Sequence, residues 1–246
     1  MLRPAEFTEA TTLAALFIAA RQAASPAMPA PVHPEDEIHA WFERVLRAER
    51  EVWVAQRDDQ RDEQVVGYLI LDPAWLDSLY VRPDLTGHGI GSALLDLAKG
   101  LRPGGFSLWV FESNLRAQRF YEAHGLLRLE RTDGSENEEQ APDIRMVWPG
   151  QRPVEALRAL VNEVDVDLGR VLARRAALTD AIQQHKDVPG HAGRDRQREA
   201  EIAQMMAAQA PNLGPERIAA IMDVVITASL DAAEHRTRRI GDVGAG

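Results

Sequence analysis

The strongest constraint on the fold is a change of pattern at Pro149-Gly150-Gln151-Arg152-Pro153. Two prolines and a glycine within five residues are typical of a linker, because proline lacks the amide donor that helices and strands use. Before this segment, short apolar runs alternate with helical patterns, and after it only helical patterns remain. The sequence therefore predicts a mixed domain over residues 1–149, a helical domain over 150–239 and a flexible tail over 240–246.

Composition excludes several classes of protein. The chain has 246 residues and no cysteine, so it has no disulfides and no thiolate metal sites. The apolar stretch Leu13–Ala20 is far shorter than the roughly 20 residues of a membrane span. Net charge is −10, and residues 1–149, with 15 basic and 24 acidic side chains, account for −9 of it. We expect a cytoplasmic protein that binds neither nucleic acid nor membranes.

The first domain reads as an α+β fold with a mixed sheet and a few helices. Residues Ala10–Ala23 and Glu37–Arg50 have helical spacing, and a proline-rich loop separates them. Apolar or β-branched runs predict strands, and helices follow two of them. The expected strands are Glu51–Ala55, Val65–Leu71, Trp75–Val81, Phe106–Phe111, Leu127–Arg131 and Ile144–Trp148; the expected helices are Ser92–Lys99 and Leu115–His124.

The second domain reads as three helices. Val154–Asp187 is expected to form one helix about 50 Å long, followed by helices over Arg194–Gln209 and Pro215–Arg236. Two shorter helices cannot cover the apolar side of so long a helix. We therefore expect a homodimer that forms through the long helices.

A glycine-rich segment stands between a predicted strand and a predicted helix in the first domain. It reads Val81-Arg82-Pro83-Asp84-Leu85-Thr86-Gly87-His88-Gly89-Ile90-Gly91-Ser92. Alternate glycines permit a tight turn that presents backbone N–H groups, and the helix adds its positive end. This combination favours binding of a pyrophosphate. A second segment, Asn114-Leu115-Arg116-Ala117-Gln118-Arg119-Phe120-Tyr121, directly follows another predicted strand.

Together these segments resemble the GNAT family of acyl-CoA-dependent N-acetyltransferases, over residues 1 to about 148. The resemblance implies the GNAT fold, acetyl-CoA as cosubstrate, no metal and an amine acceptor of unknown identity. The family's [Q/R]-x-x-G-x-[G/A] loop corresponds to Thr86–Gly91, and Thr86 departs from the usual Arg or Gln. The implied coenzyme-binding residues are Val81, Thr86, Gly87, His88, Gly89, Ile90, Gly91, Ser92 and Asn114.

Acetyl transfer needs a base for the amine and an acid for the departing sulfur. Tyr121 matches the tyrosine that protonates the thiolate in many members of the family. Asp77, on the strand that leads to the glycine loop, is our candidate base. The negative charge of this domain favours a cationic amine as the acceptor.

The helical domain carries its charges at defined intervals. Arg175 and Lys186 are 11 residues apart and would share one face of a continuous helix, whereas Arg158 would lie on another face. Asp195, Arg198 and Glu199 would cluster on the second helix. These intervals, with Asp165 and Ser229, resemble the all-helical chorismate mutase family from about Arg152 to His235. Lys186, one of only two lysines beside 26 arginines, stands at the family's catalytic lysine.

This resemblance implies rearrangement of chorismate to prephenate without acid, base or nucleophile. Arg175 and Arg158 would bind the two carboxylates, with Arg158 supplied by the other subunit. Lys186 would donate to the ether oxygen. Asp195 and Glu199 would hold the ring hydroxyl, and Arg198 would support a carboxylate. Ser229 would line the pocket.

One position departs from the chorismate mutase pattern. The family usually has Gln or Glu four residues after Ser229 as a second donor to the ether oxygen, and here Ala233 stands there, followed by Glu234. We therefore expect a bifunctional enzyme, an acetyltransferase and a chorismate mutase. The alternatives are a helical domain that serves only for dimerisation or for sensing an aromatic metabolite, or one that acts on 4-amino-4-deoxychorismate or isochorismate.

Overall fold

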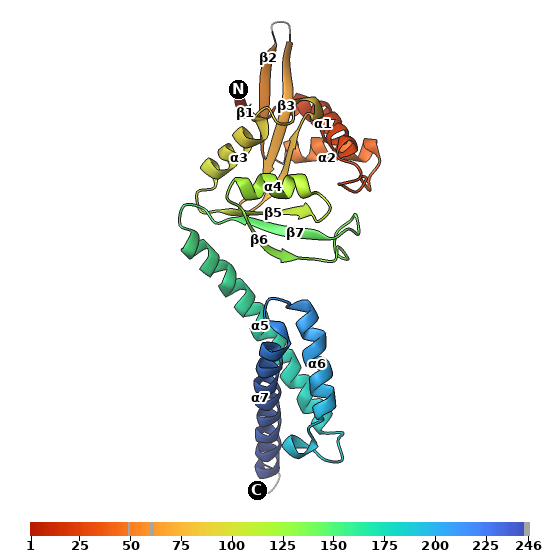
Figure 1. Cartoon of the computed structure of the whole chain (residues 1–246), viewed down its shortest axis with the longest axis vertical. Coiled ribbons are helices and arrows are strands. Elements are labelled where there is room, and N and C mark those ends of the chain that lie inside the picture. The colour runs from red at the N-terminus through yellow and green to blue at the C-terminus, as the bar shows by residue number, and fades with distance from the viewer. Residues whose placement is uncertain (49, 60–61, 244–246) are drawn as a thin grey trace. The chain divides into compact units, whose positions relative to one another are not determined.

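The computed structural model describes residues 1–48, 50–59 and 62–243. In this part of the chain, strands and helices alternate up to the predicted linker and only helices follow it (Figure 1). The chain separates into two compact units, Met1–Ala159 and Leu160–Gly246. The division falls inside α5 (Pro153–Gln183), so this helix begins in the first unit and continues in the second.

The first unit contains two antiparallel sheets. Their strand orders are β1-β2-β3-β4 and β5-β7-β6. The strands are β1 (Leu2–Pro4), β2 (Glu51–Asp59), β3 (Asp62–Leu71), β4 (Leu76–Val81), β5 (Phe106–Phe111), β6 (Leu127–Arg131) and β7 (Asp143–Trp148). A parallel bridge between Trp75 and Ser107 joins the two sheets where β4 approaches β5. Beyond this bridge the two strands belong to separate sheets, which leaves room for a cleft between them.

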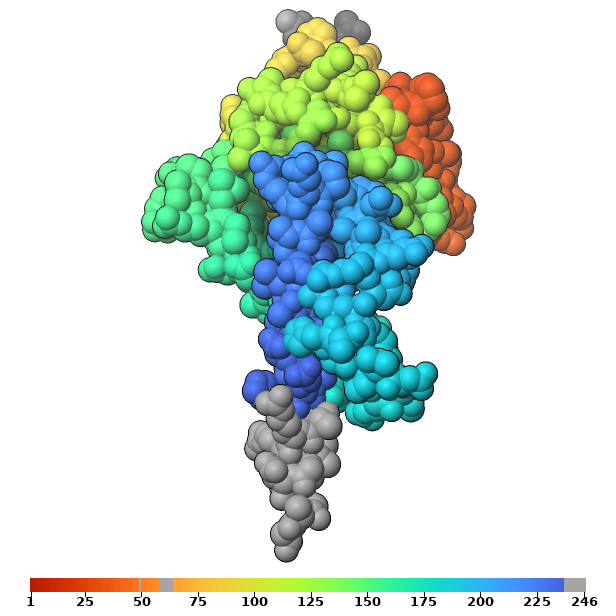
Figure 2. Space-filling view, turned by 60° about the horizontal axis from the view of Figure 1, so that its bottom comes forward, coloured from red at the N-terminus to blue at the C-terminus, as the bar shows by residue number. Residues whose placement is uncertain are grey.

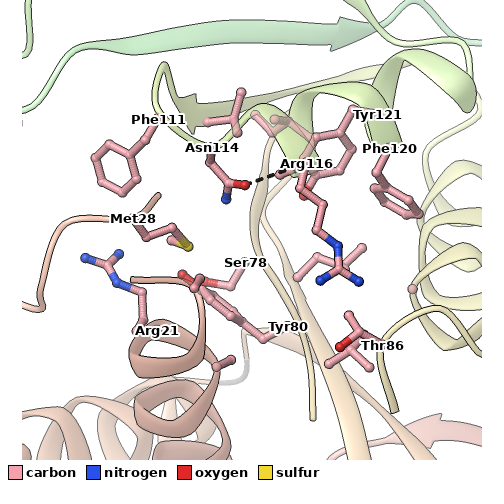
Figure 3. Close-up of a pocket in the computed structure, with 18 of the residues that line it drawn as sticks. Arg21, Met28, Ser78, Tyr80, Thr86, Phe111, Asn114, Arg116, Phe120 and Tyr121 are labelled. Carbon is pink, nitrogen blue, oxygen red and sulfur yellow. Dashed lines mark hydrogen bonds between the residues drawn. The ribbon is translucent and has the colours of Figure 1, made fainter. Parts of the chain in front are cut away.

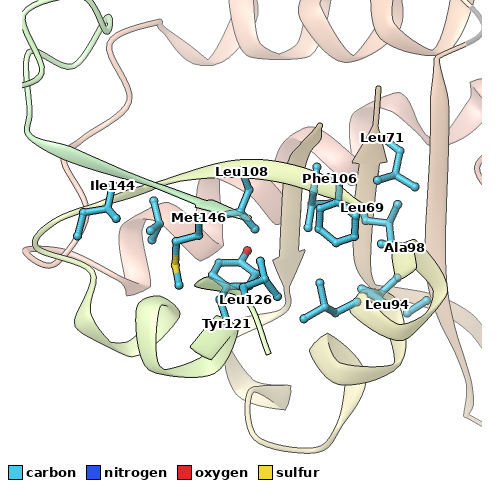
Figure 4. Packing of buried hydrophobic residues seen from close by; sticks show 14 of the residues in the cluster. Leu69, Leu71, Leu94, Ala98, Phe106, Leu108, Tyr121, Leu126, Ile144 and Met146 are labelled. Carbon is cyan, nitrogen blue, oxygen red and sulfur yellow. The ribbon is translucent and has the colours of Figure 1, made fainter. Parts of the chain in front are cut away.

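The central strand β3 carries apolar side chains on both faces, as a strand covered on both sides must. Tyr68 and Ile70 pack with α1 (Ala10–Ala23) and α2 (Glu35–Arg47). Leu69 and Leu71 face a second core, which α3 (Ile90–Leu101) and α4 (Leu115–Ala123) complete together with the second sheet. Figure 4 shows this core, with Tyr121 packed beside Leu126 and Met146.

Gly67 in β3 allows α3 to approach the sheet closely. A β-carbon at this position would lie 3.0 Å from the carbonyl oxygen of Tyr80 and 3.1 Å from the side chain of Ile90. The N-terminus of α3, which follows the glycine loop, is therefore held against β3 and β4.

The second unit is built on the packing of α6 against α7. Helices α6 (Arg196–Gln209) and α7 (Gly214–Val243) lie side by side (Figure 2) and share an apolar core of Ala203, Ile218, Met222, Ile226 and Leu230. The 3-10 turn η3 (Gly190–Gly193) precedes α6. Within the described residues, no helix combines the length and apolar character needed to cross a membrane.

The predicted helices and strands are present, but several of them begin or end at other residues than predicted. Strand β1 was not predicted, because three residues are too few for a periodic pattern. Helix α2 ends at Arg47 rather than at Arg50, and α5 ends at Gln183 rather than at Asp187. The prediction that Lys186 shares a helical face with Arg175 is therefore wrong, because Lys186 lies in the following turn.

The end of the chain also differs from the prediction. Helix α7 continues to Val243, so the first four residues of the expected tail are helical. The remainder of that tail, residues 244–246, lies outside the described residues.

Candidate functional site

A cleft of about 710 Å³ lies between β4 and β5 in the first unit. Its walls come from the two strands, from α1 and from α4, and it ends at the glycine loop that precedes α3 (Figure 3). Every residue of β4 from Leu76 to Val81 lines it. Because β4 and β5 do not pair along the cleft, their backbone groups there are available to a bound molecule.

The glycine loop adopts the geometry that its sequence predicts. Gly87 and Gly89 have φ angles of +87° and +81°, a region that side chains with a β-carbon rarely enter. Gly89 is the N-cap of α3 and offers no side chain to cap it. The first N–H groups of this helix are thus available to an anion, and the helix dipole favours negative charge there. Thr86, Gly87, Gly89, Gly91 and Ser92 line the cleft.

Two polar side chains of this region are already engaged. The hydroxyl of Thr86 donates to the carbonyl of Pro83. The hydroxyl of Ser92 lies 2.9 Å from Nε2 of His124, a contact that ties α3 to the end of α4. The backbone of this loop, rather than its side chains, is therefore the feature suited to binding phosphate. The side chain of His88 is exposed.

Arg116 brings a positive charge to the same end of the cleft. It lines the cleft from the first turn of α4, and its guanidinium points toward the loop that carries Thr86 (Figure 3). Within the described part of the chain it makes no ion pair. The sequence analysis missed this residue, although its place two positions after Asn114 was visible. Only the fold shows that α4 directs it at the glycine loop.

Asn114, the N-cap of α4, and Tyr121, on α4 as predicted, both line the cleft. The side chain of Asn114 caps the helix, accepting a hydrogen bond of 3.1 Å from the N–H of Ala117. Tyr121 is 9% exposed, and burial raises its pKa well above the ordinary value. Its hydroxyl therefore keeps its proton throughout the neutral range.

Asp77 lies on β4, where the cleft meets a second cavity. Its carboxylate accepts a hydrogen bond of 3.0 Å from the hydroxyl of Ser78 and lies 3.4 Å from the guanidinium of Arg50. Arg50 also pairs with Asp72. The side chain is partly exposed and is positioned by these contacts rather than free on the surface.

In the second unit, the predicted charged residues make contacts in three places. The first lies between α5 and α7, where Arg175 donates to Oγ of Ser229 at 2.7 Å and to the carbonyl of Val225 at 3.4 Å. Ser229 is buried and donates in turn to Val225. Arg158, on the same helix as Arg175, is exposed.

The second place is the turn η3. The ammonium of Lys186 donates to the carbonyl of Gly193 at 2.6 Å. Gly190 begins the same turn with a φ of +71°, and a β-carbon there would lie 2.5 Å from a carboxylate oxygen of Glu234. Lys186 and Glu234 therefore reach one short turn from different elements. Ala233, which precedes Glu234 on α7, is buried.

The third place is the start of α6. Arg194 donates to both carboxylate oxygens of Glu199, at 2.7 and 2.8 Å, and to Asp223 of α7 at 2.6 Å. The hydrogen bonds from Arg194 lower the pKa values of both carboxyl groups. Glu199 therefore stays ionised and can act only as a hydrogen-bond acceptor. Arg194 was missed by the sequence analysis, because its partner Asp223 is 29 residues away and only the packing of α6 on α7 unites them.

Asp195 and Arg198 flank this cluster. The carboxylate of Asp195 caps α6 by accepting a hydrogen bond of 3.0 Å from the N–H of Arg198. The guanidinium of Arg198 is exposed and pairs with Glu201 at 3.1 Å. Asp195, Arg198 and Glu199 thus stand at the start of α6 as predicted, but their side chains make hydrogen bonds with different partners.

Comparison with known families agrees with this division of the chain. The sequence model of the acetyltransferase (GNAT) family matches residues 17–126, and that of chorismate mutase type II matches residues 157–234. The chain is a fusion of a GNAT acetyltransferase domain and a type II chorismate mutase domain. The two predicted families are confirmed, and with them a bifunctional enzyme.

Individual relatives match the GNAT domain. The peptidyl-lysine N-acetyltransferase YjaB of Salmonella typhimurium is 29% identical over 125 residues, which are 46% of this chain and 83% of the relative. YjaB of Escherichia coli is 29% identical over 107 residues, 44% of this chain and 70% of the relative. The solution structure of apo YjaB from Escherichia coli covers 61% of this chain and 97% of its own, with 25% identity and a TM-score of 0.47.

The predicted functional residues fall inside the two matched ranges. Asp77, the glycine loop, Asn114 and Tyr121 lie within the GNAT range, and they meet in one cleft. In the chorismate mutase domain, the expected residues from Arg158 to Ser229 lie within the second range. There the structure brings Arg175 to Ser229, whereas Lys186 and Glu199 make their contacts elsewhere in the domain.

Proposed function

We propose that the GNAT domain transfers an acetyl group from acetyl-CoA to a primary amine in the cytoplasm. The observation that carries this proposal is the cleft between β4 and β5, which leads to uncapped N–H groups at the start of α3. The pyrophosphate would bind at those groups, with Arg116 as a cation beside it. The pantetheine arm would lie along the backbone of β4 up to Val81, past Asn114.

The chemistry consists of amine attack on the thioester carbonyl. A carbon–nitrogen bond forms, the carbon–sulfur bond breaks, and the sulfur leaves with the bonding electron pair. Tyr121 would donate a proton to this sulfur, since its hydroxyl remains protonated at neutral pH. Asp77 would accept the proton that the amine loses, because it stands at the junction of the cleft and the neighbouring cavity.

The helical domain would convert chorismate to prephenate. This rearrangement gains most from holding the reactive conformer and from stabilising negative charge on the breaking ether bond. Arg175, fixed by Ser229, would bind one carboxylate, and Lys186 would donate to the ether oxygen. Glu199, kept ionised by Arg194, would accept the hydrogen bond of the ring hydroxyl.

The chorismate mutase site would form in a homodimer. Seven apolar side chains of α5 stand at heptad positions and are more than half exposed: Val154, Val161, Val164, Leu168, Val171, Leu178 and Ile182. The heptad position between Val171 and Leu178 is Arg175, which contacts Ser229 of α7. A heptad repeat of apolar residues is typical of helices that coil around one another. A second copy of α5 would cover this seam, and Arg158 of that copy would complete the site.

The departure at Ala233 favours one alternative, a helical domain that binds an aromatic metabolite without converting it. Ala233 offers no donor, and its side chain is buried. Loss of one donor to a developing oxyanion slows an enzyme by roughly 10²–10³-fold. Glu234 follows Ala233 and reaches the same turn as Lys186. It is the acidic residue that could replace the missing Gln or Glu.

Loss of chorismate absorbance, followed with the wild-type protein and its Lys186→Ala variant, tests the chorismate mutase proposal. We expect turnover that depends on Lys186. Binding of chorismate without turnover would support the sensing alternative instead. Mixing Arg158→Ala with Lys186→Ala subunits tests the shared site, because one intact site per heterodimer would restore activity. No recovery in exchanged dimers would contradict it.

A further inference from the structure

A second cavity, of about 430 Å³, adjoins the coenzyme cleft in the GNAT domain. It is enclosed by α1, α2, β4 and the loop between β6 and β7. The two cavities share Arg21, Asp77, Ser78 and Tyr80. A molecule in the second cavity therefore reaches the candidate base and the acetyl end of a coenzyme bound in the cleft.

One wall of this cavity is aromatic. Phe17 of α1 meets the ring of Tyr80 edge to face at 5.1 Å, and Trp41 of α2 meets Phe42 in the same way at 4.9 Å. All four rings line the cavity. Aromatic rings that surround a cavity favour a ligand with a planar apolar body, because edge and face contacts add to the area buried.

The remaining lining is rich in carboxylates. Asp77, Glu37, Glu138 and Glu139 come from three different elements and converge on one space. Arg21 pairs with Glu139 at 2.8 Å, and His33 lies between Glu37 at 2.8 Å and Glu138 at 3.0 Å. Arg44 also lines the cavity, so four carboxylates face the side chains of Arg21, Arg44 and His33. A bound molecule that is itself cationic would improve this balance.

The same ion pairs span one side of the cavity, which is partly open. Glu138 and Glu139 belong to the β6–β7 loop, whereas Arg21 and His33 belong to α1 and to the segment before α2. The Arg21–Glu139 pair is the more buried of the two connections, with side-chain exposures of 5% and 20%. A cavity of this volume has the size of a small-molecule site.

Arg21 supplies a separate indication of a ligand. Its Nε is buried and has no hydrogen-bond partner within the described residues, although its Nη2 donates to Glu139 and to the carbonyl of Pro29. A buried donor without a partner costs roughly 1–3 kcal/mol. An acceptor atom on a molecule bound in either adjoining cavity would remove that cost.

We propose that this cavity holds the acetyl acceptor, and that the acceptor is a small cationic amine with an aromatic body and a carbonyl-type oxygen near the amine. This inference rests on the proposed acetyltransferase function and deepens it. The amine would lie beside Asp77, the ring against Phe17 and Trp41, and the oxygen near Arg21. The ammonium first gives one proton to Asp77, and the neutral nitrogen then attacks the thioester carbonyl. The carbon–sulfur bond breaks, the sulfur leaves with the electron pair and takes a proton from Tyr121, and the nitrogen gives up its second proton, so that one proton is released overall.

Acetylation rates with a set of amines test the proposal. The probes are L-phenylalaninamide, β-phenylethylamine without the carbonyl, L-glutamate as an anionic amine, and a capped peptide with one lysine. Release of coenzyme A by the full chain is followed with each. We expect kcat/KM for L-phenylalaninamide to exceed that of every other probe by about tenfold or more. An equal or higher value for the lysine peptide or for L-glutamate would overturn the proposal.

Variants of residues that line the second cavity test whether the acetyl acceptor binds there. Trp41→Ala and Glu37→Gln should each lower kcat/KM for L-phenylalaninamide by about tenfold and leave the KM of acetyl-CoA unchanged. Glu43→Gln is the matched control, because Glu43 is exposed on α2 and does not line the cavity. Wild-type values in both wall variants would overturn the assignment of this cavity.

Calorimetry with acetyl-CoA alone separates this proposal from the underlying function. If acetyl-CoA binds but L-phenylalaninamide is not acetylated, the acceptor assignment is wrong and the coenzyme site stands. If acetyl-CoA does not bind, the acetyltransferase proposal fails and the acceptor assignment fails with it.

Discussion

At the residue scale, we propose that Arg116 takes the place of the Arg or Gln that the GNAT family usually has at Thr86. The Arg116 guanidinium points from α4 toward the same loop. The sequence predicted the loop, because glycines that permit positive φ before a helix are a local signal. It did not predict the position of Arg116, because the approach of α4 to the glycine loop depends on how β4 and β5 separate.

Replacing Arg116 by Gln should therefore weaken coenzyme binding. We expect the KM of acetyl-CoA to rise roughly tenfold, with kcat nearly unchanged, because one charge-assisted contact to phosphate is lost. Steady-state kinetics at low and high salt measure this effect. Arg119→Gln is the matched control, since Arg119 is exposed on the same helix and does not line the cleft. An equal effect in both variants would point to the overall charge of α4 instead.

Tyr121 gives a second prediction at this scale. Tyr121→Phe retains the ring that packs in the core and removes only the hydroxyl, so the fold should be retained. We expect kcat for acetyl transfer to fall by about 10²–10⁴-fold, while acetyl-CoA affinity stays the same. Calorimetry and kinetics on the same preparation separate the two effects. A large loss of affinity would show that the hydroxyl has a structural role.

At the scale of elements, the strands and helices were largely predictable and the contacts between loops were not. The apolar run of β3 and the helical spacing in α1, α3 and α4 are local patterns. The pairing of Arg21 with Glu139 joins residues 118 positions apart, and no local pattern contains it. For the same reason, the sequence predicted β6 and β7 but not the ion pairs that join the loop between them to Arg21 and His33.

His33 should make the contact between the β6–β7 loop and the segment before α2 sensitive to pH. Its contacts with Glu37 and Glu138 raise its pKa. The contribution of the charged imidazole is therefore fully present below its ordinary pKa, and it is lost as the pH rises through the higher folded-state value. Protection of residues 132–142 from hydrogen exchange, corrected for intrinsic rates, should fall over that range. His33→Gln should remove the dependence; a pH profile unchanged in the variant would contradict this prediction.

At the scale of the whole molecule, the exposed apolar heptad positions of α5, called the heptad seam here, support the proposed homodimer. Within the described residues, the apolar core of the second unit comes from α6 and α7, and α5 leaves its seam exposed. The sequence analysis predicted a dimer from the length of this helix. The exposed heptad positions now specify the face through which it would form.

Leu168→Glu places a carboxylate in the middle of this seam and should dissociate the dimer. We expect the sedimentation coefficient to shift to that of a monomer and chorismate turnover to fall with it, because an unpaired buried charge is strongly unfavourable. Val166→Glu is the matched control, since it makes the same type of change on the same helix outside the seam. Acetyl transfer should persist in both variants. A Leu168→Glu dimer would argue against this interface.

The position of Lys186 on an exposed turn makes its amine a possible target of acetylation. The chain has only two lysines. Lys99 donates to the carbonyl of His124, and the amino group of Met1 donates to the carbonyl of Gln56. Lys186 stands on an exposed turn, where acetyl-CoA in solution can reach its amine. Acetylation there would remove the charge proposed to stabilise the breaking ether bond, so the mass of the peptide that contains Lys186 would report the fraction of disabled chorismate mutase sites.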